Sequence, residues 1–570
     1  MIKKTFAIIL ASLIMMQLFA QQSLKGYYRS PLPDDMPISF AGNFGELRAN
    51  RFHAGLDFRI GGVPGAKLYA VADGYIARIF VGPEGYGKAV YINHPNGTTS
   101  VYGHLHNFSP KIKAYIEELQ YKRQRFAIDE RLSPATIPLK KGDFIGNAGN
   151  SGSSFGAHLH FELRKTDTQT PFNVLSAGIY KFTDNIAPAI KQVIFYRYDE
   201  QENEVPIVEP FLISTIAGLQ QTANVPERFF VAVDASDRQN SSNNKFGIYR
   251  MEVKLDNKLI FAYRNDEFSF DESRYVNSLM AYDRLQANSQ SLIKTYMEPG
   301  NKLSSVYEKV EDKGIITLTD DEIHQLNITV WDETGNQSDC NFDIQRHAIA
   351  PTPQAYIDEQ KMVPMYYNRD NRYEQPGMNI SIPAGSLYRS ILFTADTAMY
   401  APAYACSRLW TIHSPEVPLH SSATLHIQAD VPEHLYNKAL MVNVTKTGGV
   451  RAIGGSWNND GVTAKIASFG DYCVAVDTIA PVITPKFKKG ANLKNSETLS
   501  VKIYDDLSGI NTYKAFIDGQ WALMEYDAKN NVLIYTFDSK YIKKNTTHTL
   551  LLNVTDNRMN TAGLKTTFIW

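Results

Sequence analysis

Cysteine is scarce in this chain, with three residues (Cys340, Cys406 and Cys473) among 570. Their spacing matches neither a CxxC motif nor a zinc finger, which excludes cysteine-based metal or redox sites of those kinds. In an exported protein, an odd number of cysteines leaves at least one thiol unpaired. Cys406 and Cys473 fall in one candidate domain and are the pair considered for a disulfide. The alternative is that all three are small buried hydrophobic residues.

Net charge is also small. Lys and Arg together number 58 and Asp and Glu 59, so the formal net charge is -1. Capture of nucleic acid requires a basic patch or stripe, and this balance suggests none, so we expect no nucleic-acid partner. The composition is otherwise globular, at 44% hydrophobic and 21% charged. The length predicts about three to five domains.

Long apolar runs are lacking beyond the N-terminus. Lys3 and Lys4 precede an apolar run over residues 6–19, and Ala20 suits a cleavage site. The run is short for a membrane span, and polar residues follow it directly. We therefore predict a signal peptide over residues 1–20 and no transmembrane segment. The mature protein is expected to be exported, and periplasmic or associated with the cell envelope.

Two well-known motifs are missing. HExxH is absent, which excludes the metalloproteases that use its glutamate as the base. The glycine-rich segment over residues 142–156 leads into neither GK[ST] nor a helical pattern, which excludes a phosphate-binding loop.

The segment His158-Leu159-His160-Phe161-Glu162 has the pattern of a β-strand. Alternate side chains on a strand share a face, so His158, His160 and Glu162 lie on one side. Two neighbouring imidazoles indicate a metal or proton-transfer site. The alternative is a surface strand that carries two histidines by chance.

Two further motifs lie upstream, HAGLD from His53 to Asp57 and YGHL around His104. A catalytic zinc ion takes about three protein ligands and one water. His53, Asp57 and one histidine of the HxH pair would supply that set. Two histidines would then remain for acid–base work, and spacing alone does not say whether His158 or His160 binds the metal.

Three sequences occur in order along the chain, FHAGLDF, VYGHL and KKGDFIGNAGNSGSSFGAHLHFEL. Together they resemble the lysostaphin/LytM-type zinc metallopeptidases, which cut peptidoglycan peptides. The resemblance extends from about Gly45 to about Val174. The implied zinc ligands are His53, Asp57 and His160, and the implied catalytic histidines are His104 and His158.

The resemblance implies a zinc-dependent endopeptidase that hydrolyses peptide bonds in peptidoglycan cross-links or stem peptides. Zinc polarises a bound water, and without HExxH a histidine, His104 or His158, must act as the base. Glu162 either orients an imidazole or is a plain exposed glutamate, and Tyr102 is expected to line the groove. The alternatives are a non-catalytic LytM-like module that binds the wall or activates another hydrolase, and a structural envelope protein. Because all five family positions are filled, we favour the enzyme.

An internal repeat organises the rest of the chain. DNIAP at 184–188 matches DTIAP at 477–481, and HQLNITVWD at 324–332 matches HTLLLNVTD at 548–556. Period-2 alternation between turn signals predicts immunoglobulin-like β-sandwiches. His324 and His548 occupy matching positions and are read as structural. The first copy is longer and is expected to hold insertions around residues 200–225 and 260–310.

These patterns predict a mainly β protein, in which a lysostaphin-like antiparallel β-sheet peptidase domain with a helical insertion precedes β-sandwich (immunoglobulin-like) domains. The insertion is predicted because Ser109-Pro110 begins a helical apolar stripe. The sandwiches offer surfaces for an envelope protein partner. The predicted segments are a lead-in at 21–44, the peptidase domain at 45–183 with its insertion at about 109–138, a sandwich with insertions at 184–349, a central β domain at 350–476 and a second sandwich at 477–570.

Overall fold

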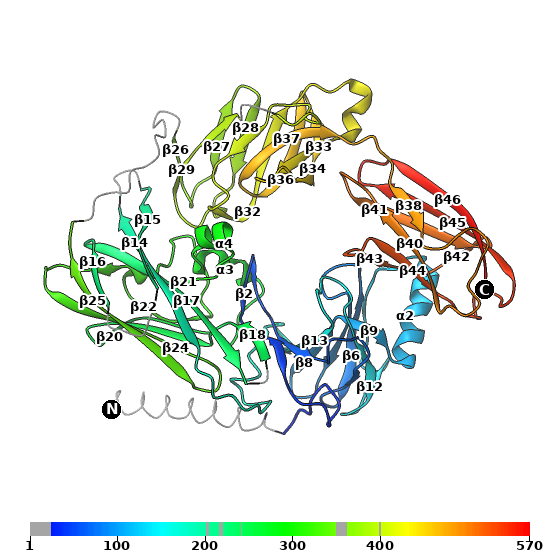
Figure 1. The fold of residues 1–570 in the computed structure, drawn as a ribbon, viewed down its shortest axis with the longest axis horizontal. Coiled ribbons are helices and arrows are strands. Elements are labelled where there is room, and N and C mark those ends of the chain that lie inside the picture. Colours follow the sequence, from blue (N-terminus) through cyan, green and yellow to red (C-terminus); the bar gives the residue numbers. More distant parts are fainter. Residues whose placement is uncertain are drawn as a thin grey trace.

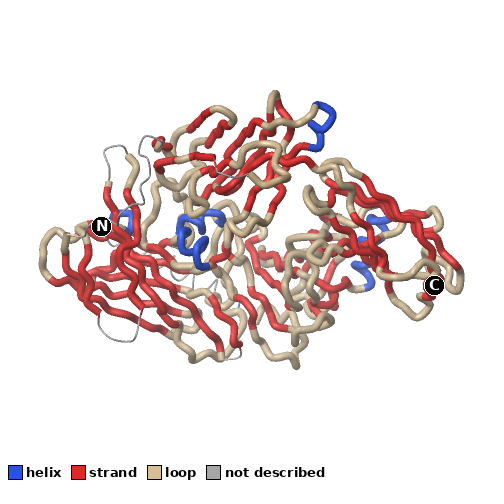
Figure 2. Tube along the Cα trace, turned by 45° about the horizontal axis from the view of Figure 1, so that its top comes forward, coloured by secondary structure: helices blue, strands red, loops and turns tan. Residues whose placement is uncertain are grey.

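The structure is a computed structural model and describes residues 24, 26–200, 204–215, 221–240, 242–348, 362–397 and 401–570. The predicted signal peptide, residues 1–20, lies outside this part of the chain. Strands dominate and helices are few and short (Figure 2), so the predicted mainly β fold is confirmed. In the described ranges, no helix is long and apolar enough to cross a bilayer.

The N-terminal body, residues 26–183, is built on one large antiparallel sheet and one small sheet. The large sheet has the order β1 (Phe40–Gly42), β4 (Leu56–Arg59), β13 (His158–Lys165), β8 (Thr98–Gly103), β7 (Lys88–Asn93), β6 (Gly74–Val81) and β10 (Ile128–Arg131), with β11 (Pro138–Leu139) also on β6. The small sheet has the order β5 (Lys67–Tyr69), β12 (Phe144–Ala148) and β9 (Leu105–Phe108), and a hairpin joins β2 (Leu47–Arg48) to β3 (Arg51–Phe52).

Strand β13 lies inside the large sheet and is buried on both faces. Leu159, Phe161 and Leu163 are fully buried in the core of the N-terminal body. The opposite face carries His158, His160 and Glu162, as strand alternation predicts. The buried apolar side chains of β13 thus fix the position of the strand, and with it the position of its polar side chains.

The lead-in is part of this body. Tyr28, Leu32 and Phe40 are buried in the same core, and β1 pairs with β4 through Phe40 and Phe58. This segment therefore builds the edge of the sheet beside those polar side chains.

The predicted insertion begins as a helix and ends as strands. Helix α2 (Pro110–Arg123) starts after Ser109 and buries Ile112, Ile116 and Gln120. The remainder returns to the large sheet, where β10 and β11 both pair with β6. The face of α2 opposite these buried residues is available for contacts with another body.

The first repeat, residues 184–348, consists of two facing sheets. One has the order β15 (Ile207–Thr215), β14 (Ala189–Asp199), β17 (Arg228–Gln239) and β18 (Ser242–Phe246), with β21 (Ile293–Lys294) and β23 (Ile316–Thr317) also on β17. The other has the order β16 (Gln221–Val225), β25 (Gln337–Arg346), β24 (Ile323–Trp331), β19 (Arg250–Leu255), β20 (Lys258–Arg264) and β22 (Tyr307–Val310). Helices α3 (Val276–Leu279) and α4 (Tyr282–Asn288) lie within the insertion predicted around residues 260–310.

The second repeat, residues 478–570, has the same strand plan in a shorter form. One sheet has the order β38 (Val482–Pro485), β40 (Thr498–Tyr504), β44 (Val532–Thr536) and β43 (Met524–Asp527). The other has the order β39 (Ala491–Asn492), β46 (Thr561–Ile569), β45 (Thr547–Asp556), β41 (Ile510–Ile517) and β42 (Gln520–Trp521). Each repeat contains a parallel pair, β16 with β25 and β39 with β46.

The recurring histidines tie equivalent turns to equivalent strands. His324 Nδ1 lies 2.7 Å from Asp256 Oδ2, and His548 Nδ1 lies 2.7 Å from Asp518 Oδ2. Each aspartate belongs to the turn that joins β19 to β20 or β41 to β42. These contacts are those of structural residues.

The central body, residues 362–477, also pairs two sheets. One has the order β27 (Asn371–Gln375), β28 (Met378–Ile382), β32 (Pro418–Gln428), β36 (Gly461–Ser468) and β35 (Ser456–Asn458). The other has the order β30 (Ala395–Thr397), β31 (Trp410–Ile412), β37 (Gly470–Val476), β33 (Ala439–Val444) and β34 (Val450–Gly454). Strands β26 (Val363–Met365) and β29 (Ile391–Phe393) form a separate small pair. None of the three cysteines is disulfide-bonded, and Cys340 and Cys473 are buried.

The four bodies follow one another around a ring (Figure 1), and the second repeat returns to the N-terminal body. Tyr121 of α2 stacks on Tyr541 with ring centroids 3.9 Å apart, and the Trp521 ring lies edge-on at 5.2 Å. Lys88 Nζ pairs with Glu525 at 2.7 Å. Helix α2 and strand β7 thus provide these contacts between the N-terminal body and the second repeat.

We predict that residues 478–570 fold on their own. Their apolar core is self-contained and includes Leu499, Leu533, Leu552 and Phe568. A protein of this span alone should show one cooperative thermal transition by circular dichroism. Random-coil dichroism without a transition would refute the boundary.

We also predict that the ring opens when its closure is weakened. A stacked aromatic pair contributes about 0.5–1.5 kcal/mol and an ion pair near the surface about 0.2–1 kcal/mol, so each of these closing contacts is weak. Tyr121→Ala with Glu525→Ala should increase the radius of gyration in small-angle scattering. Tyr115→Ala, a change on the same helix outside the stack, is the control. An unchanged radius in the double variant would contradict this account of the closure.

Candidate metal centre

Three adjacent strands and one loop bring the predicted site residues together. In the register of β13 with β4, His160 lies opposite Asp57, and in that of β13 with β8 it lies opposite Gly103. His104 follows Gly103 directly, and His53 lies in the loop before β4. Since cross-strand partners share a face, the sheet itself gathers these side chains.

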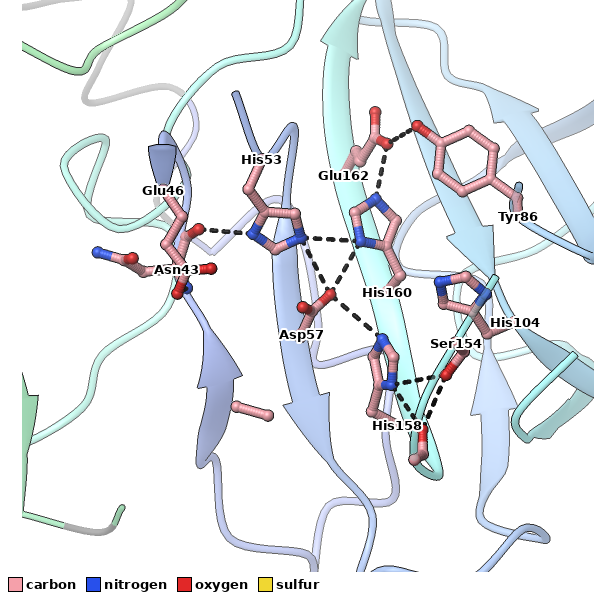
Figure 3. A network of polar contacts seen from close by, with 12 residues as sticks. Asn43, Glu46, His53, Asp57, Tyr86, His104, Ser154, His158, His160 and Glu162 are labelled. Carbon is pink, nitrogen blue, oxygen red and sulfur yellow. Dashed lines mark hydrogen bonds and ion pairs between the residues drawn. The ribbon is translucent and has the colours of Figure 1, made fainter. Parts of the chain in front are cut away.

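His53, Asp57 and His160 form a compact triangle of ligand atoms (Figure 3). His53 Nε2 lies 3.0 Å from Asp57 Oδ1 and 3.0 Å from His160 Nδ1, which lies 2.9 Å from the same carboxylate oxygen. Ligands about 2.0–2.1 Å from a tetrahedral zinc ion lie roughly 3.3 Å apart, close to these separations. The donor set of two imidazoles and one carboxylate fits a metal of this kind.

The outer atoms of all three residues are fixed by neighbours. His53 Nδ1 donates to the carbonyl of Asn43 at 2.6 Å, and His160 Nε2 donates to Glu162 Oε1 at 2.7 Å. Arg48 Nη2 donates to Asp57 Oδ2 at 3.1 Å. Such contacts select the ring nitrogen that faces the ion and hold each ligand in orientation.

Glu162 is a buried, ionised carboxylate, so the alternative of an exposed glutamate is wrong. It is 1% exposed and also accepts hydrogen bonds from Tyr86 Oη and Arg164 Nε. Burial raises its pKa, but Arg164 and the His160 hydrogen bond outweigh burial and lower the pKa to about 2. Glu162 therefore acts on His160 as a fixed negative charge.

Asp57 is also held in its charged form. Burial by itself raises its pKa, whereas the neighbouring His53, His158 and His160 hold the pKa well below its usual range. A carboxylate ligand must be deprotonated to bind a metal, and this environment keeps Asp57 ready.

The first repeat supports the metal centre through His53. Phe52 and Ala54, which flank His53, are buried in the core of the first repeat. There Phe52 packs against Phe268, with ring centroids 5.0 Å apart. The side chain of Asn43 is fastened to the same repeat by donating to Glu333 Oε1 at 3.0 Å. Asn43 could not be predicted from the sequence, since it acts through a backbone carbonyl that any residue supplies.

His104 and His158 point one ring nitrogen each toward the triangle. His104 Nδ1 donates to the carbonyl of Ser151 at 2.8 Å, and His158 Nδ1 donates to the carbonyl of Gly156 at 2.8 Å. Nε2 of His158 lies 3.4 Å from Asp57 Oδ1. The ring centroids of His104 and His158 lie 4.9 Å apart. Both Nε2 atoms are left for contacts other than these backbone bonds.

The environment of His104 keeps its imidazole neutral. Burial, together with the charges of His160 and His158, lowers its pKa to about 3. Its backbone has a φ of 62°, a left-handed conformation that is uncommon outside glycine. Such strained residues concentrate at functional sites, where the surrounding structure holds them in place.

The loop behind both histidines contacts the second repeat. Lys529 Nζ donates to the carbonyl of Ser154 at 2.9 Å and also to that of Asn150. Ser154 Oγ lies 3.3 Å from His158 Nδ1. The closed ring therefore reaches the loop that holds His104 and His158.

Tyr102 and two other histidines, His94 and His106, lie outside the centre. Tyr102 is fully buried and accepts a hydrogen bond from the Val71 amide, so its predicted place in the groove is wrong. His94 is buried in a turn, bonded to the carbonyl of Asp73, and His106 is exposed.

Two family models match the chain. Residues 51–120, which include His53, Asp57 and His104, match peptidase family M23. Residues 362–477, the central body, match the Zu5-like domain.

Curated relatives share the N-terminal region. The DD-carboxypeptidase/endopeptidase Mpg of Neisseria meningitidis is 34% identical over 119 residues, covering 21% of this chain and 21% of that protein. An uncharacterized metalloprotease of Haemophilus influenzae is 28% identical over 146 residues, covering 24% of this chain and 25% of that protein. The chain thus spans a quarter or less of the length of these relatives.

Solved structures also align with the chain. The catalytic domain of lysostaphin from Staphylococcus simulans is 18% identical, covers 25% of this chain and 91% of its own, and has a TM-score of 0.18. A zinc containing peptidase from Vibrio cholerae is 22% identical, covers 27% of this chain and 40% of its own, and has a TM-score of 0.20.

The geometry predicts one metal ion at this centre. Elemental analysis of the purified protein should find about one equivalent of transition metal per chain, and clearly less in His53→Ala, because the ion loses one of three protein ligands. His106→Ala, which removes an exposed histidine, should retain the metal. Full occupancy in His53→Ala would overturn the ligand set.

Proposed function

The N-terminal body contains a domain of peptidase family M23, and we propose that it is a zinc endopeptidase acting on peptidoglycan. Its substrates are peptide bonds in peptidoglycan cross-links or stem peptides. The observation that carries the proposal is the convergence of His53, Asp57 and His160 with two further histidines on one side of a rigid sheet. A module retained only for binding has no need of all five side chains.

Zinc is the proposed metal because two imidazoles and one carboxylate match its catalytic sites, which leave one position for water. When bound, zinc lowers the pKa of that water to about 7 and polarises carbonyl oxygens. His53, Asp57 and His160 hold the ion, while Asn43, Arg48 and Glu162 hold the ligands in orientation.

His104 and His158 are the proposed catalytic residues. Their Nδ1 atoms are committed to backbone carbonyls, which makes each Nδ1 a donor and leaves Nε2 as the acceptor in the neutral ring. Nε2 can accept the proton that the attacking water gives up. In its protonated form it can donate to the developing oxyanion or the leaving amine.

The substrate class is supported by the relatives. The Neisseria protein carries the name DD-carboxypeptidase/endopeptidase, which is that of an enzyme that cleaves peptide bonds. Since M23 hydrolases of peptidoglycan act outside the cytoplasm, we propose a periplasmic or envelope location. The three β bodies that follow are proposed to face peptidoglycan or an envelope protein partner.

The proposed catalytic histidines, His104 and His158, and the proposed ligand His160 are predicted to respond differently to substitution. His104→Ala and His158→Ala should keep zinc near the wild-type level, whereas peptidoglycan cleavage falls by roughly 10²–10⁴-fold, the usual contribution of a positioned acid–base group. His160→Ala should lose both zinc and activity, because it removes a ligand. The measurements are zinc content and mass analysis of the products from purified peptidoglycan, with and without chelator.

His158 and His160 provide their own matched comparison, since they are two residues apart on one strand face. Loss of zinc in His158→Ala together with its retention in His160→Ala would contradict the assignment of roles. Cleavage that is equal in the wild type and all three variants would exclude the endopeptidase. Wall binding without cleavage would favour the alternative, a module that binds the wall or activates another hydrolase.

A further inference from the structure

A second group of carboxylates lies in the first repeat, away from the candidate metal centre. Asp184 precedes β14, Asp237 lies near the end of β17, and Asp332 follows β24. One oxygen from each lies within 4.8 Å of the other two. Three segments that are distant in sequence thus direct their carboxylates to one point.

Asp237 is the least satisfied member of this group. It is 1% exposed, and neither of its carboxylate oxygens has a hydrogen-bond partner of normal geometry. The amide of Arg238 lowers its pKa without making such a bond, and Oδ2 of Asp184 is also buried without a partner. Burying an unpaired carboxylate costs several kcal/mol, so native structures pair such groups or let them bind a metal.

The charges around Asp237 increase this cost. The charges of Asp184, Asp332 and Glu333 all act on it, and among the described residues no Lys, Arg or His forms an ion pair with Asp184, Asp237 or Asp332. Burial, with the charges of these neighbours, raises the pKa of Asp237 to about 8. Asp332 Oδ1, by contrast, accepts from a nest of three backbone amides, at Thr334, Gly335 and Asn336.

The second repeat carries the matching group, Asp477, Asp505 and Asp556, with a cationic side chain near it. Burial lowers the pKa of the Arg558 guanidinium, the charges of Asp477 and Asp556 oppose that shift, and Arg558 Nη2 donates to the carbonyl of Gly455. Counting from Asp332 and Asp556, the position of Arg558 is taken in the first repeat by Thr334. The first repeat therefore has the same carboxylates without the cationic side chain.

We propose that Asp184, Asp237 and Asp332 bind a Ca²⁺ ion, which places in the first repeat a positive charge like the one that Arg558 brings near the matching carboxylates of the second. Ca²⁺ takes six to eight oxygen ligands at about 2.3–2.6 Å, so oxygens on opposite sides of the ion lie roughly 4.8 Å apart. The spacing of the three carboxylate oxygens fits that limit. Mg²⁺ keeps most of its water and binds one or two carboxylates, so three convergent carboxylates favour Ca²⁺.

The proposed ion lies beside the junction of the first repeat with the N-terminal body. Glu333, adjacent to Asp332, accepts from Asn43 Nδ2 at 3.0 Å. Asn43 also bonds to the backbone of Gly247 through both atoms of its amide. A filled site would stabilise the segment that receives Asn43, and through it the junction.

The test measures Ca²⁺ binding and thermal unfolding of the full chain, with zinc already loaded and the buffer freed of calcium. Titration calorimetry should show saturable Ca²⁺ binding to the wild type, and millimolar CaCl₂ should raise its unfolding temperature, because the ion binds the folded state. MgCl₂ at the same concentration should raise that temperature less. Asp237→Asn should bind about one equivalent fewer, while Asp234→Asn, the same change on the same strand outside the group, should match the wild type.

The expected effect of Asp237→Asn on the unfolding temperature differs without and with calcium, which makes the test specific. Without calcium, Asp237→Asn should unfold at the same temperature as the wild type or higher, because the cost of burying the Asp237 carboxyl is gone; with calcium it should unfold lower. Should Asp237→Asn not fold, Asp184→Asn gives the same comparison. No calorimetric binding by the wild type, an equal response to both ions, or unchanged stoichiometry in a folded Asp237→Asn would each overturn the proposal. Zinc content is read in parallel, so a failure of this site is distinguished from a failure of the metal centre.

Discussion

The pairing of β13 with β4 and β8 is the constraint on which the candidate site depends. This register sets Asp57 opposite His160 and brings His104 in from the next strand, so two potential ligands and one potential catalytic residue share a face. A slip of β13 by one residue would turn its own polar side chains, His158, His160 and Glu162, into the core, where Leu159 and Phe161 now lie. The apolar face of β13 therefore fixes the chemistry of its polar face.

The first repeat also supports the candidate site, because it holds His53, the one candidate ligand that comes from a loop. The residues on either side of His53 are buried in the core of that repeat, and Asn43, whose carbonyl accepts from the His53 imidazole, is fastened to it. The second repeat closes the ring by reaching the loop behind His104 and His158 through Lys529. The metal centre is thus supported from two sides by bodies outside its own sheet.

Much of the site could be predicted because strand parity is local. Alternation along β13 separates His158, His160 and Glu162 from the core, and the repeated sequence by itself aligns His324 with His548. The failures arise where tertiary packing decides. Tyr102 has the parity of His104 in the sequence, but in the sheet it lies opposite Phe161, on the core face, and is fully buried. Glu162 is enclosed by Arg164 and Tyr86. Asn43 acts through its carbonyl, which leaves no signal in its residue type.

The central claim is that two imidazoles and one carboxylate hold the metal, while His104 and His158 stand beside it. X-ray absorption at the zinc edge of the full chain tests this directly, because it counts imidazole ligands. The account predicts two imidazole nitrogens and two oxygens, one from Asp57 and one from water, at about 2.0–2.2 Å. A spectrum with three or four imidazoles, or with sulfur, would contradict it.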